Sequence, residues 1–435
     1  MALPRPDVAD LLDVSVPAGG QVLIASDLHL PPERTDVSAR SCEALVARLA
    51  QFQEPLTVVL AGDIAELLGF SEATATDILR AHDDLCAALL AVTERGGQVI
   101  YTIGNHDGDM AWDVKAADAA RELMGARLCL AADLLFADGR KVRVEHGHQL
   151  DRYNCFHDPR NPLDTPIGHH VVREVIPRIE WLGRGWVDGA HEMADPTDFP
   201  SFIASRLVYR KLIRHLWWLI AIPLVLLILV RIPLYVDFRD RHPDADVWIH
   251  GSVILGYGAV VDLIIILALV AIVARRAWLA VSELALDERG YEQNDAARQR
   301  AADLVADGYL GLVTGHTHHP DLRTAGGTGF YANSGSCTAV VEAVGGRFGL
   351  PPAYVRAQQV CWLEFAEPGT GKAGPGPAGT GPASADAAGI VSLMAARVVL
   401  PGATRGERFA ARGRNPFKRT PTRVASWPGG HDWPA

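Results

Sequence analysis

Short apolar runs alternate with longer amphipathic segments in the first third of the chain. Gln21–Ala25, Thr57–Ala61 and Gln98–Ile103 are short apolar runs, and the first follows a Gly-Gly pair, which predicts buried strands. Val37–Phe52 and Ser71–Arg95, which lie between them, have helical patterns. Strands that alternate with helices indicate an α/β sheet.

Strand patterns continue further along the chain, with one long interruption. Phe136–Glu145 predicts a hairpin whose turn is at Asp138-Gly139. After the interruption the strand pattern returns in Leu310–Thr314, Phe330–Ala332 and Val360–Phe365.

The interruption contains two apolar segments, Leu216–Val236 and Val253–Val273. Each has 21 residues and a single charge, Arg231 in the first and Asp262 in the second. At about 1.5 Å per residue, each is long enough to cross a hydrocarbon layer of about 30 Å. A pair of buried core helices is the alternative, but two such runs in tandem favour a transmembrane hairpin.

Basic residues flank the predicted hairpin unequally. Three lie toward the short connection: Arg231, Arg239 and Arg241. Six lie outside the two spans: Arg206, Arg210, Lys211, Arg214, Arg275 and Arg276. The positive-inside rule therefore predicts a multi-pass protein of the cell membrane with both ends of the hairpin, and the catalytic part, on the cytoplasmic side. Asp262 lies in mid-span, where it is protonated, paired or functional.

Composition narrows the class of protein. The 435 residues carry a formal charge of −10, which argues against nucleic acid as a partner of the main body. Six scattered cysteines without a CxxC motif exclude a disulfide scaffold and a zinc ribbon. The N-terminus has no apolar segment typical of a cleavable signal.

The last part of the chain, 367–435, begins with a Pro/Gly/Ala-rich stretch that is typical of a flexible linker. The segment after it is basic and has too little apolar content for a domain. A solvated tail is the simplest interpretation; contact of its Arg and Lys side chains with anionic headgroups or nucleic acid is the alternative.

Metal-ligand residue types follow the predicted strands in a regular way, and the carboxyl ends of strands in an open α/β sheet are where sites form. Asp, Asn and His donors without cysteine suit Mn²⁺, Fe or Zn²⁺. Two ions about 3.5–4 Å apart suit phosphoryl transfer and need a bridging carboxylate, for which Asp63 is the candidate. The residues are Asp27, His29, Asp63, Glu66, Asn105, His106, Asp107, His146, His148, His316 and His318.

The motifs DxH, GDxxE, GNHD, HGH and GHTH occur in this order, and the chain thereby resembles the calcineurin-like metallophosphoesterases. The resemblance covers Gln21–Leu150 and Ala306–Phe365. Ser26–Leu30, Gly315–Pro320 and Tyr331–Ser336 are similar to the bacterial UDP-2,3-diacylglucosamine pyrophosphatase branch. That branch has GNRD and HGD where this chain has GNHD and HGH, which puts the substrate of the branch in doubt.

The resemblance implies two metal ions, with Mn²⁺ favoured over Fe or Zn²⁺. It implies that His106 acts as general acid or phosphate clamp and is oriented by Asp107, with Glu66 outside the direct ligands. His148 competes with His146 as ligand, and His146 is favoured because the family ligand precedes the glycine. One ion would take Asp27, His29, Asp63 and His318, and the other Asp63, Asn105, His146 and His316.

The implied fold is an α/β metallophosphoesterase-type sandwich of two sheets flanked by helices, with an inserted transmembrane hairpin. The expected parts are an N-terminal segment (1–20), a discontinuous core (21–150 and 305–366), an insertion (151–304) and the linker with its tail (367–435). The expected function is hydrolysis of a phosphate ester or pyrophosphate, either of a lipid-linked substrate or of soluble nucleotides and phosphoesters. A non-catalytic scaffold is the remaining alternative, and the sequence leaves the oligomeric state open.

Overall fold

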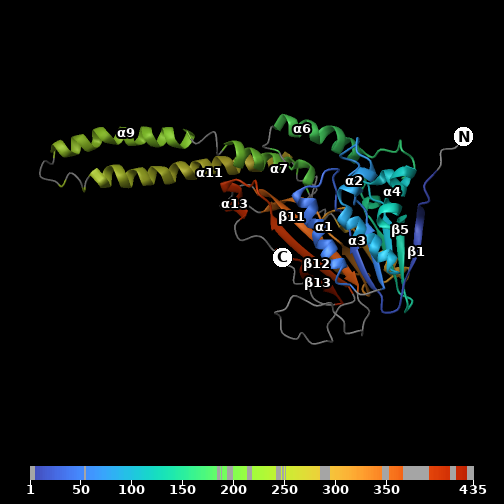
Figure 1. Cartoon of the computed structure of the whole chain (residues 1–435). Coiled ribbons are helices and arrows are strands. Elements are labelled where there is room, and N and C mark those ends of the chain that lie inside the picture. Colours follow the sequence, from blue (N-terminus) through green and yellow to red (C-terminus); the bar gives the residue numbers. More distant parts are fainter. Residues whose placement is uncertain are drawn as a thin grey trace.

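A computed structural model describes most of the chain (Figure 1). The residues described are 5–52, 55–183, 187, 189–193, 199–212, 218–241, 246, 249, 251–284, 294–344, 352–365, 391–411 and 418–428. The linker predicted from 367 onward, as well as Arg214 and Trp217 beside the first apolar segment, lie outside these residues.

Thirteen strands form the sheet, and the four segments 21–25, 56–61, 98–102 and 311–314 match predicted strands closely. The strands are β1 (Ala9–Val16), β2 (Gln21–Ala25), β3 (Leu56–Ala61), β4 (Gln98–Thr102), β5 (Ala126–Phe136), β6 (Lys141–Glu145), β7 (Gly311–Thr314), β8 (Asp321–Ala325), β9 (Gly329–Asn333), β10 (Ala339–Val344), β11 (Ala353–Phe365), β12 (Val391–Val399) and β13 (Thr422–Trp427).

The predicted helix over 71–95 is two helices, α2 and α3, which meet at His82. The described helices are α1 (Asp36–Leu49), α2 (Ala75–Ala81), α3 (Asp83–Glu94), α4 (Val114–Met124), α5 (Ile167–His170), α6 (Ile176–Gly183), α7 (Phe199–Arg206), α9 (Trp218–Arg241), α11 (Gly258–Leu284), α12 (Asp295–Ala306) and α13 (Arg405–Ala411). A π-helical stretch, η3 (Val171–Val175), joins α5 to α6.

Hydrogen bonds join the strands into one sheet in the order β13-β12-β11-β2-β3-β4-β5-β6-β7-β9-β8, with β1 beside β5 and β10 beside β11. The sheet curls so that its two ends pack together. The ring of Phe330 on β9 lies 5.1 Å from Trp427 on β13 and 6.0 Å from Phe365 on β11. The expected pair of sheets is therefore a single continuous sheet folded over its own apolar core.

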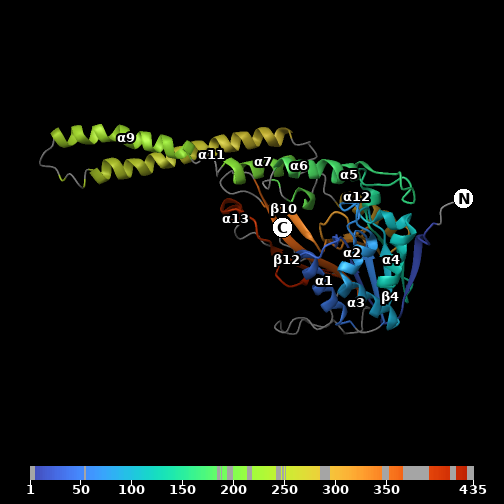
Figure 2. The same ribbon diagram turned by 45° about the horizontal axis from the view of Figure 1, so that its top comes forward.

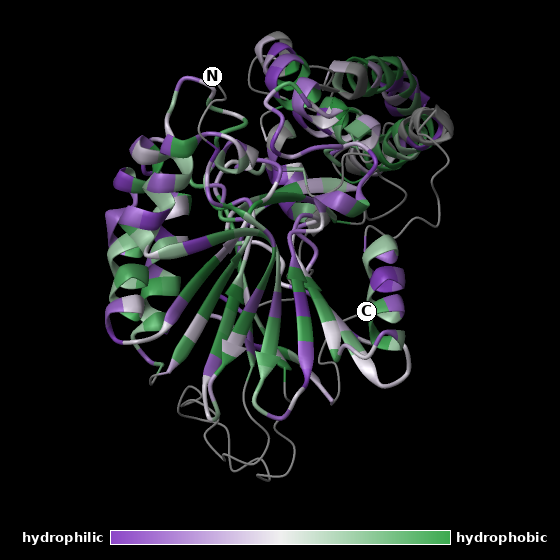
Figure 3. Ribbon diagram, turned by 90° about the vertical axis from the view of Figure 1, so that its right-hand side faces the viewer, coloured by the Kyte–Doolittle hydropathy of each residue, from purple (hydrophilic) through white to green (hydrophobic). Residues whose placement is uncertain are grey.

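Helices cover the outside of the folded sheet. Leu45 of α1, Leu89 of α3 and Ala117 of α4 pack against one half of the sheet. Ala301 and Leu304 of α12 pack against β7 and β9 in the other half. Figure 3 shows apolar residues of the helices turned toward the strands, as amphipathic helices require.

Three expected boundaries differ from the structure. Val391–Val399 and Thr422–Trp427 are not part of a tail, because β12 pairs antiparallel with β11, and β13 pairs with β12. The sequence Val391–Val399 buries Leu393 and Ala395, an alternation hidden by the basic charge of the segment. The core resumes before residue 305, since α12 packs on it, and β1 adds a strand within the expected N-terminal segment.

The insertion contains a hairpin of two long helices, α9 and α11, which projects from one flank of the core (Figures 1 and 2). Ala221–Arg241 and Leu255–Val273 are long and apolar enough to cross a membrane, by length and composition. The single charges of the two predicted apolar segments pair with each other, because the guanidinium of Arg231 donates to both carboxylate oxygens of Asp262.

Candidate metal centre

The predicted ligands lie on loops at the carboxyl ends of the parallel strands β2, β3 and β4, and of β6 and β7, which run antiparallel to them. The loops meet because β4 and β6 both end near the middle of β5, where Thr102 pairs with Cys129 and Glu145 with Ala131. The backbone is unusual there. Positive φ angles of a non-glycine residue are uncommon and cluster at functional sites. Within the described part of the chain, they occur at Asp27 (53°), His29 (45°), Asp63 (55°), His316 (69°) and His318 (57°). All five are predicted ligands.

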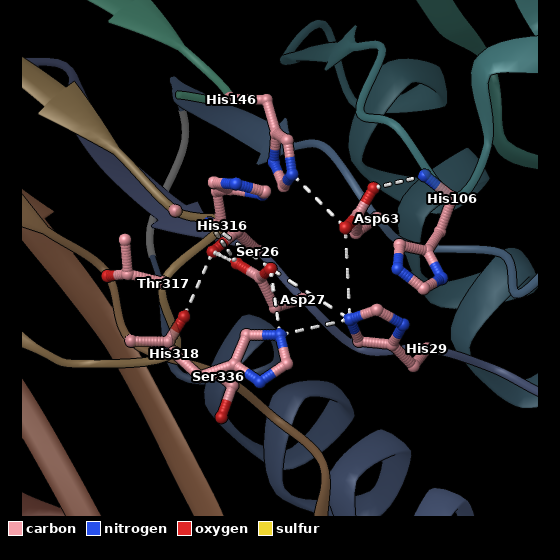
Figure 4. A network of polar contacts seen from close by, with 12 residues as sticks. Ser26, Asp27, His29, Asp63, His106, His146, His316, Thr317, His318 and Ser336 are labelled. Carbon is pink, nitrogen blue, oxygen red and sulfur yellow. Dashed lines mark hydrogen bonds and ion pairs between the residues drawn. The ribbon is translucent and has the colours of Figure 1, made fainter. Parts of the chain in front are cut away.

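The first cluster joins Asp27, His29 and His318 (Figure 4). Nε2 of His29 lies 3.1 Å from Nε2 of His318, which in turn lies 3.2 Å from Oδ1 of Asp27. Asp27 is fully buried. Ring nitrogens and a carboxylate oxygen that converge in this way match the donor set of a divalent ion.

The second cluster joins Asp63, His146 and His316, whose ligand atoms lie within 4.8 Å of one another. Nε2 of His146 is 3.1 Å from Oδ2 of Asp63, and the Nδ1 of the same ring lies 2.8 Å from the carbonyl oxygen of Ala61, which fixes its orientation. Asp63 is also 3.8 Å from His29 of the first cluster. A carboxylate between two donor clusters is the arrangement a bridging ligand needs.

Buried polar atoms without a partner support the fit of a metal ion. Oδ1 of Asn105 is buried and accepts no hydrogen bond from any residue that the structure describes. Such an oxygen costs free energy unless a cation or water satisfies it. The donor set is thus suited to two hard or borderline divalent ions.

His148 lies beside His146 but is not part of the cluster of ligand atoms. Its ring centre is 5.5 Å from that of His146, 6.4 Å from that of His316 and 5.5 Å from that of Phe156. The cluster within metal-binding reach contains His146 and not His148. This geometry favours His146 as the ligand.

His106 has a different partner from the one predicted. Its Nδ1 lies 2.8 Å from Oε1 and 2.9 Å from Oε2 of Glu66, whose Oε2 is also 2.5 Å from Nδ1 of His29. Asp107 does not orient His106, which corrects that expectation. Its buried carboxylate accepts hydrogen bonds from the Ile64 and Gly104 amides and from the Tyr101 hydroxyl, and so holds the loops.

Asp151 is a residue that the sequence did not reveal. Its Oδ2 lies 3.0 Å from Nε2 of His316, so the other ring nitrogen is the one left for a metal. No motif contains Asp151, and only its position five residues after His146 places it near the site.

Charges in the cluster shift its pKa values strongly. Burial disfavours the imidazolium form, but Glu66 and Asp63 outweigh burial and raise the pKa of His106 to about 9. Burial likewise opposes protonation of His146, yet Asp63 and Asp27 raise its pKa to about 10. The carboxylates and imidazoles thus stabilise one another, as expected where cations are to be bound.

Comparison with known families decides the class of the domain. Residues 20–207 match the family model described as calcineurin-like phosphoesterase. The chain carries a calcineurin-like phosphoesterase domain. It is accordingly a metal-dependent phosphoester hydrolase by class, as the motifs predicted. The GHTH motif lies beyond the matched residues, but the fold brings it to the same site.

Other comparisons find only distant likeness. A search of curated proteins found no match. A protein of unknown function from Aquifex aeolicus is 13% identical over 38% of this chain and 74% of its own, with a TM-score of 0.20. A dimetal phosphatase from Danio rerio is 13% identical over 80% of this chain and 96% of its own, with a TM-score of 0.29.

Proposed function

We propose that the protein is a membrane-anchored phosphoesterase with two metal ions, which hydrolyses a phosphate ester or pyrophosphate bond of a lipid-linked substrate. The observation that carries the proposal is the pair of donor clusters on either side of Asp63, with His106 beside them. In this assignment one ion takes Asp27, His29, Asp63 and His318, and the other takes Asp63, Asn105, His146 and His316.

The side chains divide the work. A pair of bound divalent ions supplies charge stabilisation for the phosphoryl transition state and a more acidic water nucleophile. Mn²⁺ suits the mixed carboxylate, amide and imidazole donors, with Fe and Zn²⁺ as alternatives. His106 donates a proton to the leaving oxygen or holds the phosphate, and Glu66 keeps its Nδ1 proton directed away from the substrate.

A helix of the insertion provides the argument for an apolar substrate. Arg173 of η3 donates to the carbonyl of Leu68, whose amide donates to the carbonyl of His106, so the helix over Ile167–Gly183 is tied to the catalytic loop. This helix exposes an apolar stripe that would suit an acyl chain. The stripe comprises Ile167, Val171, Val175 and Trp181.

Membrane anchoring by α9 and α11 is part of the proposal. The exposed surface of α9 from Ala221 to Val236 and of α11 from Leu255 to Val273 is apolar apart from Arg231, which pairs with Asp262. The flanking basic residues favour a cytoplasmic catalytic domain. A soluble phosphoester substrate, with the hairpin serving only as anchor, is the competing outcome of the test below.

The deciding experiment is a panel of substrates assayed with Mn²⁺, Fe²⁺ and Zn²⁺ in detergent and in vesicles. It compares lipid pyrophosphates, lipid phosphates, nucleotides and p-nitrophenyl phosphate. The lipid hypothesis predicts a higher kcat/KM for a lipid substrate, whereas preference for soluble esters would overturn it. Asp63→Asn should abolish all activity, and Asp13→Asn on the exposed face of β1 serves as matched control.

Anchoring and orientation are tested separately. The full chain should stay in the membrane fraction after carbonate washing. A cysteine at position 239, in the last turn of α9 before the short connection, should react with an impermeant thiol reagent added outside intact cells. Labelling at position 275 from outside would reverse the orientation, and release by carbonate would overturn the anchoring.

A further inference from the structure

The short helix α13 is fastened to the base of the hairpin by a buried ion pair. Glu407 has no exposed surface, and its Oε1 lies 2.5 Å from Nη1 of Arg206 and 3.0 Å from Nε of Arg210. Its Oε2 also accepts a hydrogen bond from the amide of Thr404, which caps the helix. Breaking a buried pair of this kind costs far more than breaking a surface pair, so α13 is held firmly.

The opposite face of α13 is basic and aromatic. Arg405, Arg408 and Phe409 follow the spacing of one helix face and are exposed, with Phe409 47% exposed. Glu407 lies about half a turn away, facing the protein. Val399, just before the helix, adds another exposed apolar side chain. The helix is thus amphipathic, and its charged and aromatic side is exposed.

This face lies where a membrane surface would be. In Figures 1 and 2, α13 lies beside the base of the hairpin, on the flank from which the hairpin projects. The candidate spans end toward the core at Ala221 and Val273. Exposed Arg275 and Arg276 follow directly after the second span, and Trp218, 44% exposed, precedes the first. Basic and aromatic residues at this level are typical of the headgroup region.

We propose that α13 contacts the headgroups of anionic phospholipids through Arg405, Arg408 and Phe409. The proposal rests on the membrane anchoring proposed above, because it takes the hairpin as the axis that crosses the bilayer. An anionic lipid surface suits two arginines and a shallowly inserted aromatic ring. Nucleic acid is also anionic and would attract the two arginines, but it would not contact the adjoining apolar hairpin.

The contact would fix the orientation of the catalytic domain. A hairpin alone leaves the domain free to tilt about its base, whereas a second contact, rigidly joined through Glu407, restrains that tilt. Arg206 is buried in this pair and Arg210 shares the same carboxylate, so these two arginines hold α13 to the hairpin base rather than contact the headgroups. The headgroup contact falls instead to α13 and to Arg275 and Arg276.

The test uses the full chain in vesicles of phosphatidylcholine alone or with one quarter phosphatidylglycerol. A single cysteine replaces Phe409 in a Cys155→Ser background, since the other native cysteines are buried. It carries a bimane label, and doxyl lipids serve as quencher. Leu226→Cys on α9 reports hairpin insertion, and Leu11→Cys on β1, 45% exposed and far from the hairpin, is the matched control.

Quenching at positions 409 and 226, but not at 11, is expected in anionic vesicles. At about 5-fold per arginine, Arg405→Gln with Arg408→Gln should lower the docked population roughly 30-fold, while Arg423→Gln on β13 should leave it unchanged. Quenching at 226 without 409 would overturn the contact alone. Absence of quenching at both positions would overturn the anchoring and the contact together. Binding to duplex DNA that depends on the two arginines, without quenching by lipid, would assign this surface to nucleic acid instead.

Discussion

The carboxylate of Glu66 lies 2.8 Å from Nδ1 of His106, and it reaches His29 of the first metal cluster at 2.5 Å. One side chain thus positions both a predicted ligand and the predicted general acid. The two imidazole rings meet edge to face with their centres 4.6 Å apart. Loss of the charge on Glu66 should therefore disturb metal binding and proton transfer together.

Glu66→Gln should lower kcat by about 10–100-fold, because partners of this kind orient ligands without touching the substrate. His106→Ala should lower it by about 10²–10⁴-fold while both metal ions stay bound. Each loss should be smaller on p-nitrophenyl phosphate, whose leaving group hardly needs a proton. Glu72→Gln, on an exposed residue of the following loop, is the control. Equal losses on good and poor leaving groups would indicate an electrostatic role instead.

Asp63 should be indispensable to both metal ions. Asp63→Asn should reduce the metal content, measured by plasma mass spectrometry, from about two ions to fewer than one per chain, because a bridging carboxylate serves both. Asp151→Asn should have a milder effect and lower the metal affinity by about 10-fold. This is the lower limit for loss of a residue that orients a ligand histidine. Retention of two ions by Asp63→Asn would rule out the shared ligand.

Asp107 should matter for stability rather than for proton transfer. The buried carboxylate of Asp107 accepts three hydrogen bonds. In Asp107→Asn the side-chain NH₂ group would face a backbone N–H, so one hydrogen bond is lost and the free energy of unfolding should fall by about 1–3 kcal/mol. Thermal unfolding measures the loss. Turnover should fall equally for good and poor leaving groups. A loss confined to poor leaving groups would restore the role that sequence reasoning gave to this residue.

The residues that the sequence proposes as metal ligands lie together in the structure, and each stands directly after a strand. The parallel strands β2, β3 and β4 bring such positions to one edge. Strands β6 and β7 run antiparallel to them and end close by, because β6 pairs with the second half of β5. Glu66 was placed in the site for the same reason. The hydrogen bond between Glu66 and His106 was not predicted. The motifs do not show which carboxylate contacts which imidazole ring, and Asp107 is nearer to His106 in the sequence.

Other features depend on contacts between distant segments and leave little local signal. Asp151 meets His316 across 165 residues. Strands β12 and β13 lie in a basic segment, which hides their apolar positions from a reading of the sequence, and β12 pairs with the distant strand β11. The pairing of Arg231 with Asp262 was one of three open alternatives, because the register of a helical hairpin is not set by its hydropathy.

The Arg231–Asp262 pair should set that register. Gly258 lies opposite Arg231, and a Cβ there would come within 2.8 Å of the guanidinium, so the glycine makes room for the pair. Asp262→Asn leaves Arg231 without its carboxylate partner in the apolar hairpin and should destabilise the hairpin. Protease resistance of the hairpin in detergent measures the loss. Asp237→Asn, which breaks an exposed pair with Arg241, should have little effect, and equal behaviour of the two variants would contradict a register-setting pair.

Alanine variants of two glycines with almost the same φ angle distinguish the effect of backbone strain from the effect of a disturbed metal site. Gly62, at φ +88°, precedes Asp63, and a Cβ there would lie 2.3 Å from Nδ1 of His146. Gly139, at φ +85°, lies in the hairpin turn between β5 and β6 with no atom within 4 Å of its Cβ position. Alanine at either position costs the left-handed penalty of about 1–2 kcal/mol, and Gly62→Ala should lose further stability because its Cβ overlaps His146. Only Gly62→Ala must also move His146, and a displacement of about 1 Å can cost 10²-fold in rate. It should therefore lose activity and part of its metal, whereas Gly139→Ala should keep both. Full activity in Gly62→Ala would mean that His146 is not needed where the structure places it.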